Sequence, residues 1–378
     1  MPIKHAKLSA SGSSRWLNCP GSVKASEKYK NGTSKFAEEG TCAHELGEIC
    51  LKSFDKNPSD YLGQTLNDAP DVTVDSEMVE HVEGYISYCR QFDGDMFVEE
   101  QVDFSQWVPD GFGTSDCIVI GDVVHVIDLK YGKGVEVYAE KNSQAMLYAL
   151  GVLNEYDCIY DFDDDQVFRL HIYQPRRAHF DAWDTTKREL MGWAQWVKER
   201  ADLALNDDAP MVPGDKQCQW CPHKANCVAL QKFTEDIITA EFENLDLPQP
   251  EKVDIVNVLK HKSLIESWLK SVEQVVFEKL LAGEHVEGFK LVEGRSNRKW
   301  GDEQIAIDTL TEHVEEEKLY TRKFVTVPQA EKLIGKAEFN TKYGDLVIKP
   351  EGKPTLAPSS DKRPPIGDVS DCFEKLDN

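Results

Sequence analysis

Three cysteines lie close together in the segment QCQWCPHKANC, which covers residues 217–227. They are Cys218, Cys221 and Cys227, with the spacing C-x2-C-x5-C. Thiolates at such spacing bind soft metals or iron–sulfur clusters, and these groups usually take four protein ligands. No second C-x2-C pair lies nearby, and His223 lies too close in sequence to complete a tetrahedron comfortably. The sequence therefore predicts a fourth ligand from a distant segment.

Cys19, in the segment RWLNCPGS, is the best candidate for that fourth ligand. The chain has ten cysteines, and in a reducing compartment so many are more typical of a metal or cluster site than of a disulfide framework. Cys372 lies in the C-terminal tail. The remaining cysteines lie in apolar patterns and are expected to be buried core thiols, namely Cys42, Cys50, Cys89, Cys117 and Cys158.

A second group of reactive side chains lies in two apolar segments joined by the dipeptide Gly-Asp at 121–122. This dipeptide predicts a hairpin turn, so Asp116 should lie nearly opposite Asp128 across an antiparallel pair. Alternation along a strand puts Lys130 on the same face as Asp128. Two carboxylates beside an ammonium group suit Mg²⁺ or Mn²⁺. Exposed strand ends often carry the pattern D-x-K without function, but charges in an otherwise apolar strand cost stability.

Two helical segments carry further candidates. Gln144 and Tyr148 are four residues apart in the predicted helix 143–156, so they share one face and can contact a phosphate or a base. An ordinary amphipathic helix shows the same pattern. His44, in the predicted helix 35–53, would add an imidazole ligand to a divalent site, although a single helical histidine is more often an ordinary surface or core residue.

The elements that must position these residues follow an α/β order. The periodicity predicts helices at 35–53, 75–93, 143–156 and 185–205, and strands at 96–104, 115–121, 123–132 and 166–175. We expect a core domain at 1–232, a C-terminal helical or α+β extension at 233–345 and a flexible acidic tail at 346–378.

Charge and hydropathy exclude some classes of protein. The net charge of −24 over 378 residues argues against non-specific binding of nucleic acid by the whole surface, but not against a local basic groove. The sequence contains no run of about 18 apolar residues, so it predicts no membrane-spanning helix. The N-terminal segment has no apolar stretch typical of a signal peptide, so we expect a cytoplasmic protein without membrane contact.

The order and spacing of these residues resemble the PD-(D/E)XK nuclease superfamily, over about residues 10–230. Within it, the chain is similar to the RecB-like branch that carries a 4Fe–4S cluster, which includes AddB-type helicase–nucleases and CRISPR-associated adaptation nucleases. The resemblance suggests a phage-encoded member. The residues that carry it are Cys19, His44, Asp116, Asp128, Lys130, Gln144, Tyr148, Cys218, Cys221 and Cys227.

The resemblance implies a restriction-endonuclease-like core, in which helices flank a central mixed sheet and an iron–sulfur clasp joins its ends. It implies that His44, Asp116 and Asp128 bind Mg²⁺ or Mn²⁺ together with the backbone carbonyl of Leu129. Lys130 matches the catalytic lysine. Gln144 and Tyr148 match a pair that positions DNA, and the four cysteines match the ligands of a structural 4Fe–4S cluster, with zinc as the less favoured alternative. The second acid here is Asp, where many relatives have Glu.

The activity implied is that of a metal-dependent exonuclease acting on linear duplex or single-stranded DNA in phage recombination or replication, in the cytoplasm of the bacterial host. A phage single-strand annealing or single-strand-binding protein is the expected partner of the C-terminal region. The alternative is a non-enzymatic module that is braced by the cluster and binds DNA ends or protein. A complete set of two acids and a lysine argues against that alternative.

Overall fold

The computed structural model describes residues 6–29, 35–242 and 259–290, together with Gly335, Phe339, Thr341, Lys342 and Val347. The chain divides into two compact units, Met1–Val286 and Glu287–Asn378. Nearly all of the predicted tail at 346–378 and much of the predicted extension at 233–345 lie outside the described residues. The predicted domain boundaries at 232 and 345 therefore stay predictions.

The first unit contains a five-stranded mixed sheet, and the strands lie in chain order across it. Strands β3 and β4 pair in parallel and every other neighbouring pair is antiparallel. A parallel pair needs a crossover connection, which helix α5 supplies. The expected α/β architecture with a mixed sheet is thus confirmed. The strands are β1 Asp95–Asp103, β2 Phe112–Ile120, β3 Val124–Leu129, β4 Val167–Gln174 and β5 His179–Thr186.

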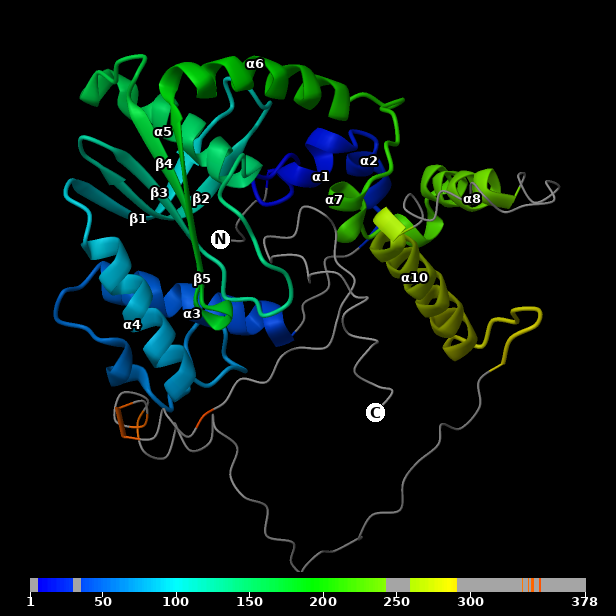
Figure 1. Cartoon of the computed structure of the whole chain (residues 1–378), viewed down its shortest axis with the longest axis horizontal. Coiled ribbons are helices and arrows are strands. Elements are labelled where there is room, and N and C mark those ends of the chain that lie inside the picture. The colour runs from blue at the N-terminus through cyan, green and yellow to red at the C-terminus, as the bar shows by residue number, and fades with distance from the viewer. Residues whose placement is uncertain are drawn as a thin grey trace, which may run out of the picture. The chain divides into compact units, whose positions relative to one another are not determined.

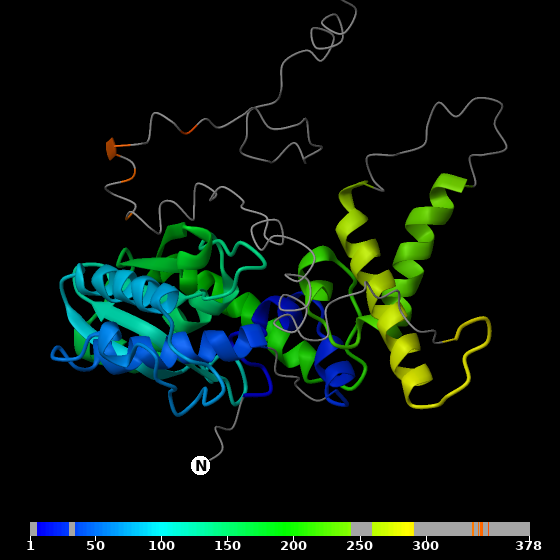
Figure 2. The same ribbon diagram turned by 90° about the horizontal axis from the view of Figure 1, so that it is seen from below.

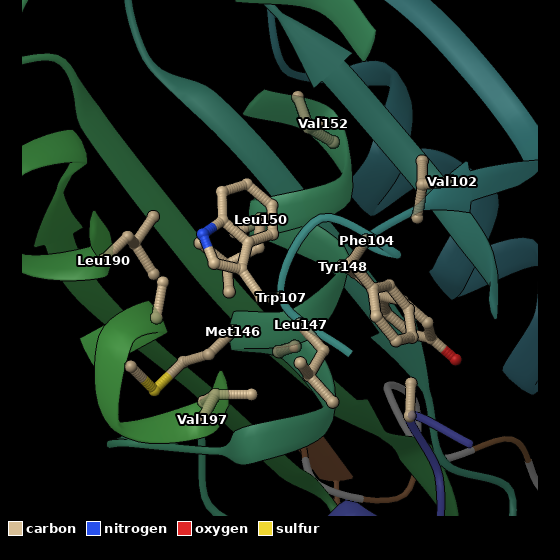
Figure 3. Packing of buried hydrophobic residues seen from close by; sticks show 14 of the residues in the cluster. Val102, Phe104, Trp107, Met146, Leu147, Tyr148, Leu150, Val152, Leu190 and Val197 are labelled. Carbon is tan, nitrogen blue, oxygen red and sulfur yellow. The ribbon is translucent and has the colours of Figure 1, made fainter. Parts of the chain in front are cut away.

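Helices cover both faces of this sheet (Figure 1). Helices α3 (Lys35–Leu51) and α4 (Ser76–Arg90) lie on one face, and α5 (Ser143–Tyr160) and α6 (Lys187–Ala204) lie on the other. Strand β2 serves both cores, because its side chains alternate: Ile118 and Ile120 join the core under α5 and α6, whereas Cys117 and Val119 join the core under α3 and α4. Figure 3 shows side chains of α5 and α6 around Trp107 in the first of these cores.

In strand β1, the alternation of side chains between the two faces of the sheet reverses at Glu99. Val98 packs into the core of α3 and α4, whereas Val102 packs into the core of α5 and α6. In a regular strand, residues four apart face the same side. Glu99 lies between them with a φ of 50°, a left-handed backbone that costs a non-glycine residue roughly 1–3 kcal/mol. The reversal turns the Glu99 position toward its neighbour across the β1–β2 pair, Asp116.

Sequence reasoning missed strand β5 and began the next helix two residues early. Strand β5 is an edge strand in which exposed and half-buried residues alternate, so it lacks the apolar run by which the other strands were found. Helix α6 begins at Lys187 because Thr186 caps it: its side chain accepts the N–H of Glu189, and the Glu189 carboxylate accepts the N–H of Thr186.

The N-terminal segment packs against the end of α6 and the loop that follows it. It contains the short helices α1 (Ser13–Asn18) and α2 (Ser22–Ser26). Arg200 Nε donates to the carbonyl of Leu17 at 2.6 Å, and the Gly21 N–H donates to the carbonyl of Pro210 at 3.0 Å. A Cβ atom on Gly21 would lie 2.6 Å from the carbonyl oxygen of Ala209, so only glycine permits this approach.

A small third core follows the sheet along the chain and joins Cys218, Leu230 and Leu264. Figure 2 shows α8 and α10, which supply the two leucines, and Lys224 Nζ donates to Ser267 Oγ of α10 at 2.6 Å. Helix α10 thus braces the cysteine segment. The elements here are α7 Asp215–Gln219, η3 Lys224–Asn226, α8 Val228–Phe242 and α10 Lys262–Leu281, and two further 3₁₀ helices are η1 Pro58–Tyr61 and η2 Pro175–Arg177.

Four of the five cysteines that were predicted to be buried in the core are buried. Cys42, Cys50, Cys89 and Cys117 are buried, but Cys158 is exposed. The prediction for Cys158 was wrong because α5 runs past the edge of the core after its buried middle turns, so its last turns face solvent, as Ile159 also does. No helix in the part of the chain that the structure describes has the length and apolar character to span a membrane.

Three hydrogen-bonded rings lie in a row, those of Tyr88 on α4, His171 on β4 and His125 on β3. His125 Nδ1 lies 3.0 Å from His171 Nε2, and the hydroxyl of Tyr88 lies 2.9 Å from His171 Nδ1. Burial is the largest cause that lowers the pKa of His125 to about 4 and that of His171 to about 3. The charge of Arg169 contributes to both values, and His125 contributes to that of His171. Asp184, which pairs with Arg169, opposes this only weakly. Both rings are therefore neutral at pH 7.

The buried pair of His125 and His171 predicts that the protein loses stability in mild acid. The unfolded chain binds protons at the ordinary histidine pKa of 6.5, but the folded protein binds them only near 4 and 3. The stabilisation is thus complete above pH 6.5 and falls as the pH drops, by about 1.4 kcal/mol per pH unit for each histidine. Denaturant unfolding at several pH values should show a shallower slope for His171→Gln, while the exposed control His285→Gln keeps the slope of the parent. Equal slopes for parent and His171→Gln would refute this account.

Candidate functional site

The β2–β3 hairpin brings the two predicted carboxylates together. Cys117 pairs with Ile127 in the antiparallel register, and one further step puts Asp116 opposite Asp128. The predicted hairpin is therefore confirmed. Asp116 Oδ2 also accepts the backbone N–H of Leu129 at 2.6 Å, which fixes the carboxylate across the hairpin. The proposed metal contact of the Leu129 carbonyl stays a prediction.

Helix α3 supplies His44 to this carboxylate pair. Its Nδ1 atom lies 3.2 Å from Asp116 Oδ1. Burial alone would lower the pKa of His44, but the charge of Asp116 outweighs it and raises this pKa to about 9. Burial would likewise raise the pKa of Asp116, yet the His44 charge and its hydrogen bond hold it below its usual value. At neutral pH the metal-free protein thus holds an imidazolium–carboxylate pair here.

The first turn of α5 organises the second carboxylate. Lys130 Nζ lies 2.7 Å from Asp128 Oδ2, and it donates to Gln144 Oε1 at 3.0 Å. The Gln144 amide nitrogen donates to Asp128 Oδ1 and to the hydroxyl of Tyr148, both at 3.0 Å. Asn142 caps the helix by accepting the N–H of Gln144. The prediction that Gln144 and Tyr148 share one face is confirmed.

The charges of this second pair are buried as well. Burial raises the pKa of Asp128, and Lys130 offsets part of that effect. Burial would lower the pKa of Lys130, but the charges of Asp128 and Asp116 outweigh it and raise this pKa. Asp128 Oδ2 and the Lys130 ammonium group form a close ion pair. A carboxylate oxygen has more than one lone pair, so Asp128 Oδ2 can still accept a cation beside this contact.

Sequence reasoning missed Glu99. In the described part of the chain, the potential metal ligands whose donor atoms lie within 4.8 Å of one another are His44, Glu99 and Asp116. Burial, with a smaller contribution from the neighbouring charge of Asp116, raises the pKa of Glu99 to about 7. Asp128 does not belong to this close set. A glutamate in the middle of the apolar segment MFVEEQVDF was a visible signal, but its left-handed backbone is not readable from the sequence.

Two clefts open on this group of charges. One has a volume of about 400 Å³ and is lined by His44 and Glu99, among others. The other has a volume of about 870 Å³, and its lining includes Lys130, Gln144 and several tryptophans. Asp116 contacts His44 in the lining of the first cleft, and Asp128 contacts Lys130 in the lining of the second.

The four predicted cysteine ligands line a single small cavity. Cys19 thus meets the other three across the chain, as predicted. Each sulfur accepts a backbone N–H, and such bonds stabilise thiolates that bind a metal or cluster. The donors are Val212 to Cys19 at 3.2 Å, Gly214 to Cys218 at 3.4 Å, Leu230 to Cys227 at 3.4 Å, and His223 to Cys221.

The four thiols share this cavity, although no three of their sulfurs in the described residues all lie within 4.8 Å of one another. Both the predicted 4Fe–4S cluster and the less favoured zinc ion stay predictions. His223 also lines the cavity, and its Nδ1 atom lies 3.0 Å from the hydroxyl of Tyr29.

Two comparisons place the chain among known proteins. A family model described as "Protein of unknown function (DUF2800)" matches residues 5–364. Among solved structures, one titled "Crystal structure of SSO0001" is 15% identical to this chain, with a TM-score of 0.28. The match covers 60% of this chain and 89% of that one. Since the TM-score is below 0.5, we draw no argument on fold or function from this likeness.

The protonation of His44 and Glu99 predicts a pH-dependent metal affinity. Both must lose a proton to bind a cation, so the affinity for Mn²⁺ should rise most steeply below pH 7, rise less steeply up to about pH 9 and level off above that. Between pH 7 and 9 we expect about a tenfold gain per pH unit by calorimetry. His44→Asn should remove the dependence in this range. Glu99→Gln should keep it but weaken binding roughly tenfold or more. An affinity for Mn²⁺ that does not change from pH 6 to 9 would contradict this assignment.

Proposed function

The chain belongs to the DUF2800 family, and we propose from the geometry of its site that it is a metal-dependent deoxyribonuclease. The observation that carries the proposal is one connected group of side chains around the buried Asp128: His44 with Asp116, and Lys130 with Asp128 and Gln144. We further propose that the fold is the PD-(D/E)XK core of the RecB-like branch with a 4Fe–4S cluster. The order of the elements around the β2–β3 hairpin supports this.

The carboxylates are the proposed ligands of a divalent ion. Asp116 and Glu99 offer oxygens beside the His44 ring, and Asp128 offers Oδ2, which also contacts Lys130. Oxygen ligands with one imidazole suit Mg²⁺ or Mn²⁺. Such an ion, when bound, polarises a phosphoryl oxygen and lowers the pKa of a water molecule. Binding requires His44 to give up the proton that its high pKa holds at neutral pH.

Lys130 is the proposed electrostatic partner of the phosphate. Its ammonium group stays charged because Asp128 and Asp116 hold its pKa high despite burial. It lines the 870 Å³ cleft, so a phosphodiester in that cleft can approach it. A fixed positive charge beside the reacting phosphate stabilises the negative charge that develops in the transition state. Gln144 orients both Lys130 and Asp128 and thereby keeps the ammonium at the cleft mouth.

The substrate and biological setting follow from the resemblance. We infer an exonuclease that degrades linear DNA during phage recombination or replication in the bacterial cytoplasm. A single-strand annealing or single-strand-binding protein is the proposed partner of the C-terminal region. The four thiols are the proposed ligands of a structural 4Fe–4S cluster, because they line one cavity and each accepts a backbone N–H.

The nuclease proposal predicts degradation of linear DNA with Mn²⁺. End-labelled linear DNA should lose nucleotides, whereas a covalently closed circle stays intact. Asp128→Asn and Lys130→Ala should each lower the rate by about a hundredfold or more, because each removes a charge next to the reacting phosphate. Lys262→Ala is the matched control, since Lys262 is an exposed lysine of α10 and its loss should leave the rate unchanged.

A protein that carries its cluster and Mn²⁺ yet leaves every linear DNA intact would contradict the nuclease proposal. If the same preparation bound DNA ends or a partner without cleavage, the result would support the alternative of a non-enzymatic, cluster-braced binding module.

The cluster proposal predicts a brown protein after anaerobic purification, with about four iron atoms and four sulfides per chain. Cys19→Ser should lose most of the iron and lower the denaturation temperature, because Cys19 closes a loop of about 200 residues. Cys158→Ser is the control, since its thiol is exposed and lies outside the clasp. Metal analysis of a colourless protein with one zinc per chain would instead favour a zinc site.

A further inference from the structure

Four tryptophans line the 870 Å³ cleft beside the proposed catalytic lysine. Trp193 and Trp196 come from one face of α6, and their ring centroids lie 6.5 Å apart. Trp183 comes from β5, and Trp220 follows α7. Trp196 and Trp220 remain 42% and 73% exposed, respectively. Large aromatic rings gathered in an open cleft mark a binding surface, because exposure of so much apolar area is unfavourable in water.

The segment that carries Trp220 is held on both sides. Cys218 lies two residues before Trp220, and Cys221 follows directly after it. The Cys221 N–H donates to the carbonyl of Cys218 at 3.3 Å. Both cysteines line the thiol cavity with Cys19 and Cys227. The backbone of this highly exposed ring is therefore anchored by the clasp. An anchored backbone lowers the entropy that the segment loses when a ligand contacts the ring.

The charges in the cleft are balanced. Its lining includes three lysines and three glutamates, so it does not form a basic channel for phosphates. The chain as a whole carries −24. Affinity for nucleic acid in this cleft must therefore come mainly from the rings. The charged lining residues are Lys130, Lys141, Lys216, Glu136, Glu140 and Glu189.

We propose that the tryptophan cleft binds unpaired nucleobases by stacking, with Trp196 and Trp220 as its principal contacts. Bases inside a duplex stack on one another and present only their edges, so the rings can reach bases of a single strand or an unpaired end. The cleft is continuous with Lys130 and Gln144, so stacked bases direct the neighbouring phosphodiester to them. This inference rests on the proposed nuclease function and gives its substrate as unpaired strand ends.

The test measures binding without cleavage. The Asp128→Asn protein is mixed with a fluorescein-labelled oligothymidylate in EDTA, and the dissociation constant is read from fluorescence anisotropy. Within this parent, Trp220→Ala and Trp196→Ala should each weaken binding about tenfold. Trp220→Phe should retain most of the affinity because it keeps a ring. Phe54→Ala is the control, since Phe54 is 84% exposed and lies outside the cleft.

The salt dependence and a duplex competitor add independent readouts. Because the charges of the cleft lining balance, we expect the affinity to fall only slightly with salt. Stacking on unpaired bases predicts that a blunt duplex competes poorly. The iron content of each variant is measured as well, so that a damaged clasp is not mistaken for a lost stacking contact. Single-strand binding that is unchanged in both alanine variants, with iron content intact, would overturn the proposal.

Cleavage by the wild-type protein, assayed in parallel, separates this inference from the nuclease proposal. Cleavage of linear DNA with unchanged binding by both alanine variants refutes the stacking site and leaves the nuclease standing. Tryptophan-dependent binding without any cleavage supports the stacking site and refutes the nuclease.

Discussion

The structure depends on the burial of opposite charges where β2, β3, α3 and α5 meet. Asp128 is almost fully buried, and an unpaired carboxylate there would cost several kcal/mol. Lys130 and Gln144 satisfy it from one side, while His44 and the Leu129 N–H satisfy its neighbour Asp116. A well-packed apolar cluster would stabilise the fold at least as well. The arrangement is therefore better explained by chemistry than by stability.

The cysteine clasp supports that group of charges from a distance. The N-terminal segment that Cys19 anchors also reaches the start of α5, where Ser13 Oγ lies 2.7 Å from Ser143 Oγ. Gln144 is the next residue along α5 and contacts both Lys130 and Asp128. We therefore expect loss of the proposed cluster to loosen the helix turn that positions the ammonium group.

Those features that depend on local geometry could be predicted from the sequence. The Gly-Asp turn and strand alternation were enough to place Asp116 opposite Asp128, and helical spacing was enough to pair Gln144 with Tyr148. Glu99 was missed because its role depends on a left-handed backbone, which sequence periodicity does not reveal. Strand β5 was missed because one half of an edge strand faces water, and its pattern then differs little from that of a loop.

The most direct test of the central claim is a crystal structure grown with Mn²⁺, with the ion located by its anomalous scattering. The account predicts one strong peak in contact with Asp116, Glu99 and His44, with Asp128 turned toward it. In that structure Lys130 should still contact Asp128 or Gln144. A site that stays free of Mn²⁺ while the ion binds the exposed acidic loop at 160–166 would contradict the claim that these buried charges form a metal centre.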